Sequence, residues 1–314
     1  MVSMHKLARF TLVSAGTVVG LLALGLGTTA TVNAVASASE ASELVTYGET
    51  VRVDGKRMNV GISGDGPTTI VLLPGLGTAS PVLDFAPLVA DLDDDYRVVV
   101  VEPFGYGLSD QTDAPRTAAA IAGEVHEAVR ALGIDSYALA GHSIAGIYGL
   151  EYVDRFRAEV TAFVGIDSSV PDQPGSSDPT AVDGMDALKN LGLLRLLTSL
   201  APGMYDDLDA YDEQAKRQLA ILGNRNAMTP TLIDEIERTP DNFASVRDLA
   251  FPRDLPLLEF VVADGPEVTG WADLHEEQVA SVDRGELVLI DGGHYLHHTA
   301  SAEIAAGMRE FLSR

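Results

Sequence analysis

The sequence predicts an α/β fold in which helices cover both faces of a largely parallel sheet. Short apolar runs recur along the chain without polar alternation, which is typical of strands that are buried on both faces. Most of these runs are followed by a segment with helical periodicity, the order expected of β–α units. The chain has 314 residues, of which 46% are hydrophobic, and this is enough for one large domain.

The expected strands and helices follow in order along residues 44–314. Residues 44–62 predict a β-hairpin, because apolar and polar residues alternate around the turn pair Asp54-Gly55. Buried strands are expected at 69–73, 97–101, 137–140, 162–166, 257–262 and 287–290. Helices are expected near 80–92, 115–132, 144–157, 271–281 and 299–313.

One interval, about 171–250, is too long for a simple connection between strands and contains no strand candidate. It opens with a loop-like stretch and then becomes helical in pieces, for example at 185–200 and 212–222. A structureless loop of this length is improbable in a compact domain. The interval therefore predicts a helical lid over the carboxyl edge of the sheet.

The N-terminal segment, residues 1–40, is distinct from the rest of the chain. A basic start is followed by a stretch from Phe10 to Ser39 without any charged residue. This pattern is typical of an export signal, with cleavage sites at 34–36 or 36–38. The stretch is also long enough to be an uncleaved membrane anchor. A third interpretation is a segment that is buried or has no membrane role. The first two interpretations place the folded domain, 41–314, outside the cytoplasm, either secreted or anchored to the membrane.

Charge and cysteine content exclude several classes of function. The formal net charge is −25, from 46 acidic and 21 basic residues, and this field repels nucleic acid and anionic lipid. Nucleic acid is therefore not an expected partner, and membrane contact is expected only through the N-terminal segment, if it is uncleaved. The absence of cysteine rules out disulfides and thiol catalysis.

The most informative motif is Gly141-His142-Ser143-Ile144-Ala145-Gly146, directly after the apolar run 137–140 and before a helical stretch. A strand, a tight turn with small residues two positions before and after a serine, and a helix together form a nucleophile elbow. Gly141 and Ala145 meet the size requirement. The motif predicts Ser143 as a nucleophile at the carboxyl edge of the sheet.

Two further motifs follow strand ends at the same predicted edge. The segment Leu73-Pro74-Gly75-Leu76-Gly77-Thr78 follows the first parallel strand, and the backbone N–H groups of Leu76 and Ile144 are the candidate oxyanion hole. His294 follows the last strand and a Gly-Gly pair, which makes it the candidate base for the serine. The side chain of His142 is expected to point away from the reacting hydroxyl.

The candidate acid remains ambiguous in the sequence. Asp264, which follows the strand at 257–262, is the favoured partner of His294, and Asp167, one strand earlier, and Glu267 are the alternatives. His294, His297 and His298 also have a metal-like spacing, but nothing else in the sequence supplies a ligand set. Neither a metal nor a cofactor is therefore expected.

A serine, an acid and a histidine in this order resemble the α/β-hydrolase superfamily over about residues 44–314. The segment from Glu102 to Asp110 resembles the glycine-rich turn after the fourth strand of that family. The resemblance implies an eight-stranded, mostly parallel sheet with antiparallel first strands and a lid after the sixth strand. It also implies Ser143 as nucleophile, His294 as base, and Asp264 as acid in most members or Asp167 in a minority.

The function expected from this resemblance is that of a membrane-associated or exported bacterial-type serine hydrolase. The reaction expected is cleavage of an acyl ester, or of an amide or thioester, through an acyl-enzyme, with a small-molecule acyl substrate. A serine nucleophile argues against dehalogenases and epoxide hydrolases, which use aspartate. The alternatives are a non-catalytic ligand-binding protein of the same fold and a cofactor-free perhydrolase. The sequence does not determine acyl specificity or oligomeric state.

Overall fold

The computed structural model describes residues 4–263, 268 and 270–314, with side chains from residue 17 onward. The chain divides into two compact units. Unit 1 comprises residues 1–44 and 183–204, and unit 2 comprises residues 45–182 and 205–314. The interval expected to form a lid, about 171–250, is therefore shared between the two units.

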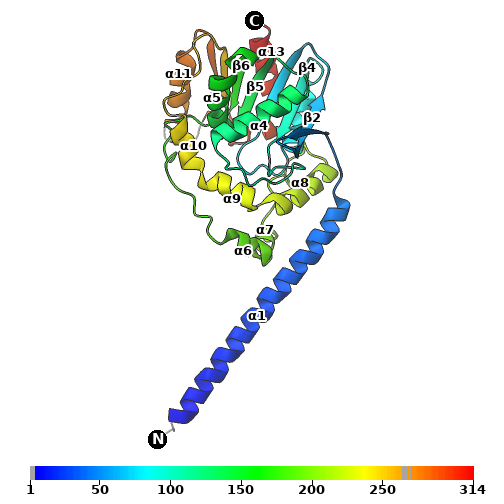
Figure 1. The fold of residues 1–314 in the computed structure, drawn as a ribbon, viewed down its shortest axis with the longest axis vertical. Helices are drawn as coiled ribbons and strands as arrows, with labels where there is room; N and C mark the ends of the chain where they lie inside the picture. Colours follow the sequence, from blue (N-terminus) through cyan, green and yellow to red (C-terminus); the bar gives the residue numbers. More distant parts are fainter. Residues whose placement is uncertain (1–3, 264–267, 269) are drawn as a thin grey trace. The chain divides into compact units, whose positions relative to one another are not determined.

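Unit 2 is built on an eight-stranded sheet with helices on both faces (Figure 1). The strand order across the sheet is β1-β2-β4-β3-β5-β6-β7-β8. The pairs β1–β2 and β2–β4 are antiparallel, and the remaining pairs are parallel, which confirms the expected sheet. The strands are β1 (Glu49–Val53), β2 (Lys56–Ser63), β3 (Thr68–Leu73), β4 (Tyr96–Glu102), β5 (Tyr137–His142), β6 (Val160–Ile166), β7 (Leu257–Val262) and β8 (Gly285–Ile290).

The turn of the first hairpin explains why its sequence signal was strong. Asp54 and Gly55 both adopt positive φ, of 48° and 77°. Positive φ at both central residues is the requirement of a type I′ turn, whose twist matches that of the paired strands. Glycine has no Cβ and meets this requirement without steric cost.

The helices of unit 2 cover both faces of its sheet (Figure 1). Side-chain caps mark several of their starts: for example, Ser80 accepts a hydrogen bond from the amide of Leu83, and Thr117 from that of Ala120. The segment expected as a single helix at 80–92 is interrupted at Phe85, whereas the one expected at 299–313 is a single helix over 301–312. The helices are α2 (Pro81–Asp84), α3 (Ala86–Leu92), α4 (Ala118–Ala131), α5 (Ala145–Phe156), the 3₁₀ turn η1 (Arg157–Glu159), α11 (Trp271–Ala280), α12 (Leu296–Thr299) and α13 (Ser301–Leu312).

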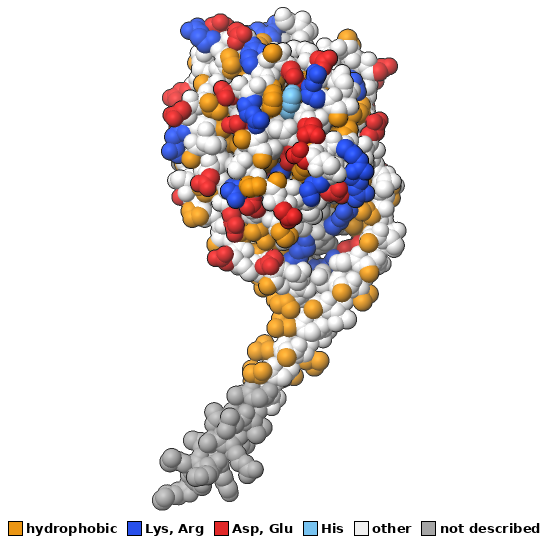
Figure 2. Space-filling view, in the orientation of Figure 1, with side chains coloured by type: hydrophobic (Ala, Val, Ile, Leu, Met, Phe, Trp, Pro, Cys, Tyr) orange, Lys and Arg blue, Asp and Glu red, His pale blue; other side chains and the backbone are white. Residues whose placement is uncertain are grey.

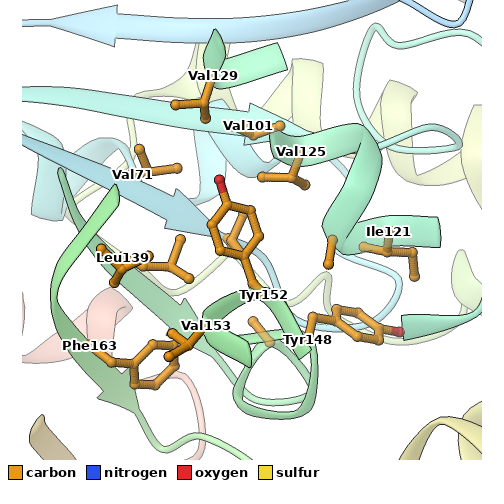
Figure 3. Packing of buried hydrophobic residues seen from close by; sticks show 14 of the residues in the cluster. Val71, Val101, Ile121, Val125, Val129, Leu139, Tyr148, Tyr152, Val153 and Phe163 are labelled. Carbon is orange, nitrogen blue, oxygen red and sulfur yellow. The ribbon is translucent and has the colours of Figure 1, made fainter. Parts of the chain in front are cut away.

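The hydrophobic core lies in two layers, one on each face of the sheet. On the first face, Tyr152 of α5 lies among strand residues Val71 and Leu139 and α4 residues Val125 and Val129 (Figure 3). On the opposite face, the alternate residues of the same strands pack against α3 and α13, as strand pleating requires. That second layer includes Ile70, Leu72, Val98, Ala138, Leu88 and Phe311.

The residues between β6 and β7 are helical, as expected. In unit 2 they form α8 (Glu213–Asn226), α9 (Pro230–Glu237) and α10 (Thr239–Ser245), and in unit 1 they form α6 (Met185–Asn190) and α7 (Leu193–Thr198). The helices α9 and α10 were not among the expected elements. Each has a proline in its first turn, where the missing N–H is not needed by the helix.

The N-terminal segment of unit 1 is one helix, α1 (Met4–Glu43). Within the described part of the chain, it is the helix long and apolar enough to cross a membrane. Its most apolar 18-residue window has a mean hydropathy of 1.7 and is not buried against other residues. A signal sequence has the same length and composition, so this feature alone does not separate an anchor from an export signal.

Candidate active site

Ser143 lies in the sharp turn between β5 and α5. Its φ of 56° is in the left-handed region, which non-glycine residues rarely adopt outside functional turns. A Cβ on Gly141 would lie 2.8 Å from the Cβ of Ala145, and one on Gly146 would lie 2.2 Å from the carbonyl oxygen of Ser169. Small residues at these positions therefore let the strand, the turn and the helix approach closely, with the serine at the tip.

Ser143 and His294 are brought together from chain segments that are far apart in the sequence. His294 lies in the loop between β8 and α12, and its Nε2 is 2.9 Å from Ser143 Oγ. Its Nδ1 is 2.6 Å from Asp167 Oδ2. Because a carboxylate only accepts hydrogen bonds, Nδ1 carries a proton, and in the neutral imidazole Nε2 is then the acceptor of the serine hydroxyl.

Asp167 lies immediately after β6, and its carboxylate is held by more than the histidine. Its Oδ1 accepts hydrogen bonds from Trp271 Nε1 at 2.7 Å and from the amide of Val262 at 3.1 Å. These donors orient the carboxylate and stabilise its charge in a site where it is only 5% exposed.

The structure thus brings Ser143 and His294 together with Asp167, the alternative acid of the sequence analysis. The favoured acid, Asp264, and the third candidate, Glu267, lie outside the described residues. The catalytic acid of such a site accepts a hydrogen bond from the histidine. In this structure His294 Nδ1 already donates that bond to Asp167.

The backbone after β3 lies against the serine. A Cβ on Gly75 would be 3.2 Å from Ser143 Cβ, and Thr78 donates two hydrogen bonds, from its N and Oγ1, to the carbonyl of Gly75. Among the described residues, no hydrogen bond occupies the amide of Leu76 or that of Ile144. These two amides, expected from the sequence as the oxyanion hole, are thus available to an acceptor.

His142 has a structural role that the sequence analysis did not foresee. Its Nε2 donates to the backbone carbonyl of His294 at 3.0 Å, and its ring lies 4.7 Å from the rings of His294 and His297. Burial, followed by the neighbouring imidazoles, holds the pKa of His142 well below its usual value. It is therefore a neutral donor that positions the loop of the candidate base.

A second buried cluster, centred on Asp84, supports the same loop. The Asp84 carboxylate accepts hydrogen bonds from His297 Nε2 at 2.8 Å, His298 Nε2 at 2.7 Å and the Tyr205 hydroxyl at 2.7 Å. Burial alone would raise the pKa of Asp84, but the two imidazoles beside it hold the pKa well below its usual range. The cluster ties α12, which begins two residues after His294, to α2.

The Asp84, His297 and His298 ligand atoms lie within 4.8 Å of one another, a spacing that could in principle receive a metal ion. Hydrogen bonding already uses the Nε2 atoms of both imidazoles and both oxygens of Asp84. These contacts account for the cluster without a metal. No signal in the sequence marked Asp84, because it lies more than 200 residues before its partners.

Glu259 of β7 is fully buried beside the site. Burial raises its pKa to about 8 with a further contribution from Asp167, and the hydrogen bond that Ser168 Oγ donates at 2.9 Å opposes the shift only in part. The side chain is therefore mostly protonated at neutral pH. This keeps a second negative charge away from the Asp167 carboxylate.

The raised pKa of Glu259 predicts a pH-dependent effect of Glu259→Gln on stability. At low pH Glu259 is protonated in both the folded and the unfolded chain, so its ionisation does not change the free energy of unfolding. As pH rises from about 4.5 to about 8, only the unfolded chain releases the proton, so the wild type loses stability. Glutamine cannot ionise, and the variant should gain up to about 5 kcal/mol relative to the wild type across this range.

Urea unfolding of both proteins at several pH values between 5 and 8.5 measures this gain. Two stability profiles that run parallel over the whole range would contradict a protonated Glu259.

Residues 70–306 match the family model described as "Alpha/beta hydrolase family". The chain belongs to the alpha/beta hydrolase family. Solved members with similar folds include the epoxide hydrolase VrEH1 from Vigna radiata (TM-score 0.63, 19% identity, 84% of this chain and 97% of that one). A thermophilic esterase from Thermogutta terrifontis is similar to the same extent (TM-score 0.64, 15% identity, 84% and 98%).

Curated relatives also match parts of this chain. YbdG of Bacillus subtilis, described as uncharacterized, is 30% identical over 180 residues, or 57% of this chain and 54% of its own length. An Escherichia coli protein named "Putative carbamate hydrolase RutD" is 34% identical over 98 residues, 31% of this chain and 36% of its own length. The chain thus spans about half or less of these relatives' length.

Proposed function

We propose that this hydrolase is a serine hydrolase that cleaves an acyl ester through a covalent acyl-enzyme. The observation that carries the proposal is the hydrogen-bonded series Ser143–His294–Asp167, with distances of 2.9 and 2.6 Å. A serine within reach of an imidazole, which is itself oriented by a buried carboxylate, is the arrangement that activates a hydroxyl as a nucleophile.

In the first half-reaction, Ser143 Oγ attacks the acyl carbonyl while His294 Nε2 takes the hydroxyl proton. The amides of Leu76 and Ile144 bind the oxyanion that forms, each lowering the barrier by about 3 kcal/mol. His294 then gives its proton to the leaving alcohol as the carbon–oxygen bond breaks. The acyl group remains on Ser143.

In the second half-reaction, His294 takes a proton from a water molecule that attacks the acyl-enzyme. The collapse of the second tetrahedral intermediate releases the carboxylic acid and returns the proton to Ser143 Oγ. Asp167 keeps the proton of the neutral imidazole on Nδ1 and stabilises the imidazolium in both halves. The name of one relative, "Putative carbamate hydrolase RutD", mentions carbamates. A carbamate presents a carbonyl to the same attack, so carbamates belong among the substrates to be tested.

The proposed partner is a small acyl substrate, and the proposed location is outside the cytoplasm, secreted or anchored through α1. A helix as apolar as α1 at the start of the chain supports that location.

Labelling with a fluorophosphonate probe tests the activated serine directly. We expect the wild type to be labelled, Ser143→Ala to be unlabelled, and His294→Ala to be labelled at least 100-fold more slowly. Ser313→Ala, which changes an exposed serine in the last turn, is the matched control and should be labelled at the wild-type rate. Labelling of Ser143→Ala, or none of a folded wild type, would contradict the proposal.

A further inference from the structure

Within unit 1, the end of α1 is joined by a charged contact, which we call the clasp, to residues 185–204, which we call the α6–α7 segment. The guanidinium of Arg195 in α7 donates to both carboxylate oxygens of Glu40, at 2.6 and 2.8 Å. It also donates to Asn33 Oδ1 at 2.8 Å and Ser37 Oγ at 3.1 Å. The side chains of Arg195 and Glu40 are only 19% and 11% exposed. A mostly buried ion pair with several hydrogen bonds fixes the positions of its two helices more strongly than an exposed ion pair does.

The backbones of the two segments also approach closely beside the clasp. Gly192 has a φ of 74°, and a Cβ there would lie 2.5 Å from the carbonyl oxygen of Thr29. Asn33 Nδ2 donates to the carbonyl of Lys189 at 3.2 Å. Asn33, Ser37 and Glu40 are spaced as neighbours on one face of a helix. The α6–α7 segment is therefore packed along one face of the last turns of α1.

The α6–α7 segment exposes large apolar side chains. The exposed fractions are 46% for Leu196, 62% for Leu197, 77% for Leu200 and 55% for Met204. The chain contains 46 acidic residues, yet none lies between positions 187 and 204. A local surface that is apolar and free of negative charge suits lipid, whereas the strongly acidic remainder of the chain does not.

The clasp lies where α1 would leave a membrane. About 20 apolar residues span the hydrocarbon core, and the uncharged stretch runs from Phe10 to Ser39. Figure 2 shows apolar side chains along the visible face of α1. The other clasp residues on α1 occupy the end of this stretch, and Glu40 is the first charged residue after it. A segment packed at this level lies beside the lipid headgroups.

We propose that α1 is retained in the mature protein and holds the α6–α7 segment at the surface of a phospholipid bilayer, with Leu196, Leu197, Leu200 and Met204 inserted into it. Cleavage at 34–36 or 36–38 would cut α1 inside the clasp and remove Asn33. The proposal adds a second membrane contact to the one expected from the N-terminal segment. It does not depend on the proposed catalysis.

Fluorescence quenching measures the insertion directly. The chain has no cysteine, so Leu197→Cys can be labelled at one site with an environment-sensitive fluorophore. In full-length protein reconstituted into phosphatidylcholine vesicles, brominated acyl chains should quench this label at least threefold. Ser313→Cys, exposed on unit 2, is the matched control and should be quenched much less. Equal quenching at the two sites would overturn the proposal, and self-association without quenching would assign the apolar surface to a second copy.

A charge exchange tests the clasp. Arg195→Glu places two carboxylates together and should reduce quenching at position 197 several-fold, and the double variant Arg195→Glu with Glu40→Arg should restore it. Unchanged quenching in Arg195→Glu would contradict the role of the clasp. Fluorophosphonate labelling of the same proteins reports the serine site separately, so a failed catalytic proposal is distinguishable from a failed membrane proposal.

The intact mass of protein extracted from the membranes of producing cells completes the test. The proposal expects a chain that still contains all of α1 (Met4–Glu43). A chain that begins at Ser37 or Ser39 would overturn it, because α1 would then be a cleaved signal.

Discussion

Replacing Asp167 by asparagine should lower kcat on an acyl ester by about 10,000-fold. Asp167 Oδ2 accepts the Nδ1 proton of His294, while Trp271 and the amide of Val262 occupy its other oxygen. Asparagine would keep its oxygen toward these two donors and turn its NH₂ group toward Nδ1. The imidazole would then carry its proton on Nε2 and could not accept the proton of Ser143.

Steady-state kinetics of Asp167→Asn and Asp264→Asn on one ester distinguish the two candidate acids. We expect Asp264→Asn to stay within a few-fold of the wild type, because His294 already has its carboxylate partner. The thermal midpoints of both variants separate loss of chemistry from loss of fold. The reverse ranking of the two variants would move the acid from the end of β6 to the end of β7.

Asp84→Ala should destabilise unit 2 by about 3–5 kcal/mol, the cost of leaving buried charged or polar partners without their acceptor. His297 and His298 both donate to Asp84, and the side chains of all three are less than 5% exposed. Such a loss in the free energy of unfolding corresponds to a fall in Tm of roughly 10 °C in a domain as long as unit 2. Activity should also fall, because the cluster holds α12 in place and α12 begins two residues after His294.

Asp94→Ala is the matched control, since it removes an exposed aspartate after α3 and should change Tm by less than 2 °C. Calorimetry of the two variants and the wild type makes the comparison. A Tm of Asp84→Ala within 2 °C of the wild type would show that the buried cluster contributes little. An effect on kcat without any change in Tm would instead give the cluster a role limited to positioning His294.

Much of the fold could be predicted because each element carries its own local signal. The hairpin at Asp54-Gly55 depends on two adjacent residues, and each buried strand from β3 to β7 depends on a continuous apolar run. The strand at 287–290 was wrongly expected to be buried: β8 lies at the edge of the sheet and is mostly only partly buried. The helices α9 (8 residues) and α10 (7 residues) were missed, because such short helices show little periodicity in the sequence. The grouping of residues 183–204 with α1 could not be foreseen either, because Arg195 and Glu40 are 155 positions apart.

In the candidate site, too, some residues lie in local sequence motifs and others do not. Ser143 and His294 each stand in a short motif next to a strand end, and a motif of this kind can be read from neighbouring residues alone. The acid has no such motif, because a single aspartate follows each of two neighbouring strands. To choose between them, one must know which aspartate lies within hydrogen-bond distance of the His294 imidazole, and that depends on the three-dimensional positions of the two strand ends.

The sequence by itself therefore determined the α/β hydrolase fold, the elbow with Ser143 and the loop with His294, since turns and buried strands depend on residues close in the chain. Only the tertiary structure joined His294 to Asp167, Asp84 to its two histidines, and Arg195 to Glu40. The physical reason is that charged and hydrogen-bonded pairs act over a few ångströms in space and impose no fixed spacing along the chain.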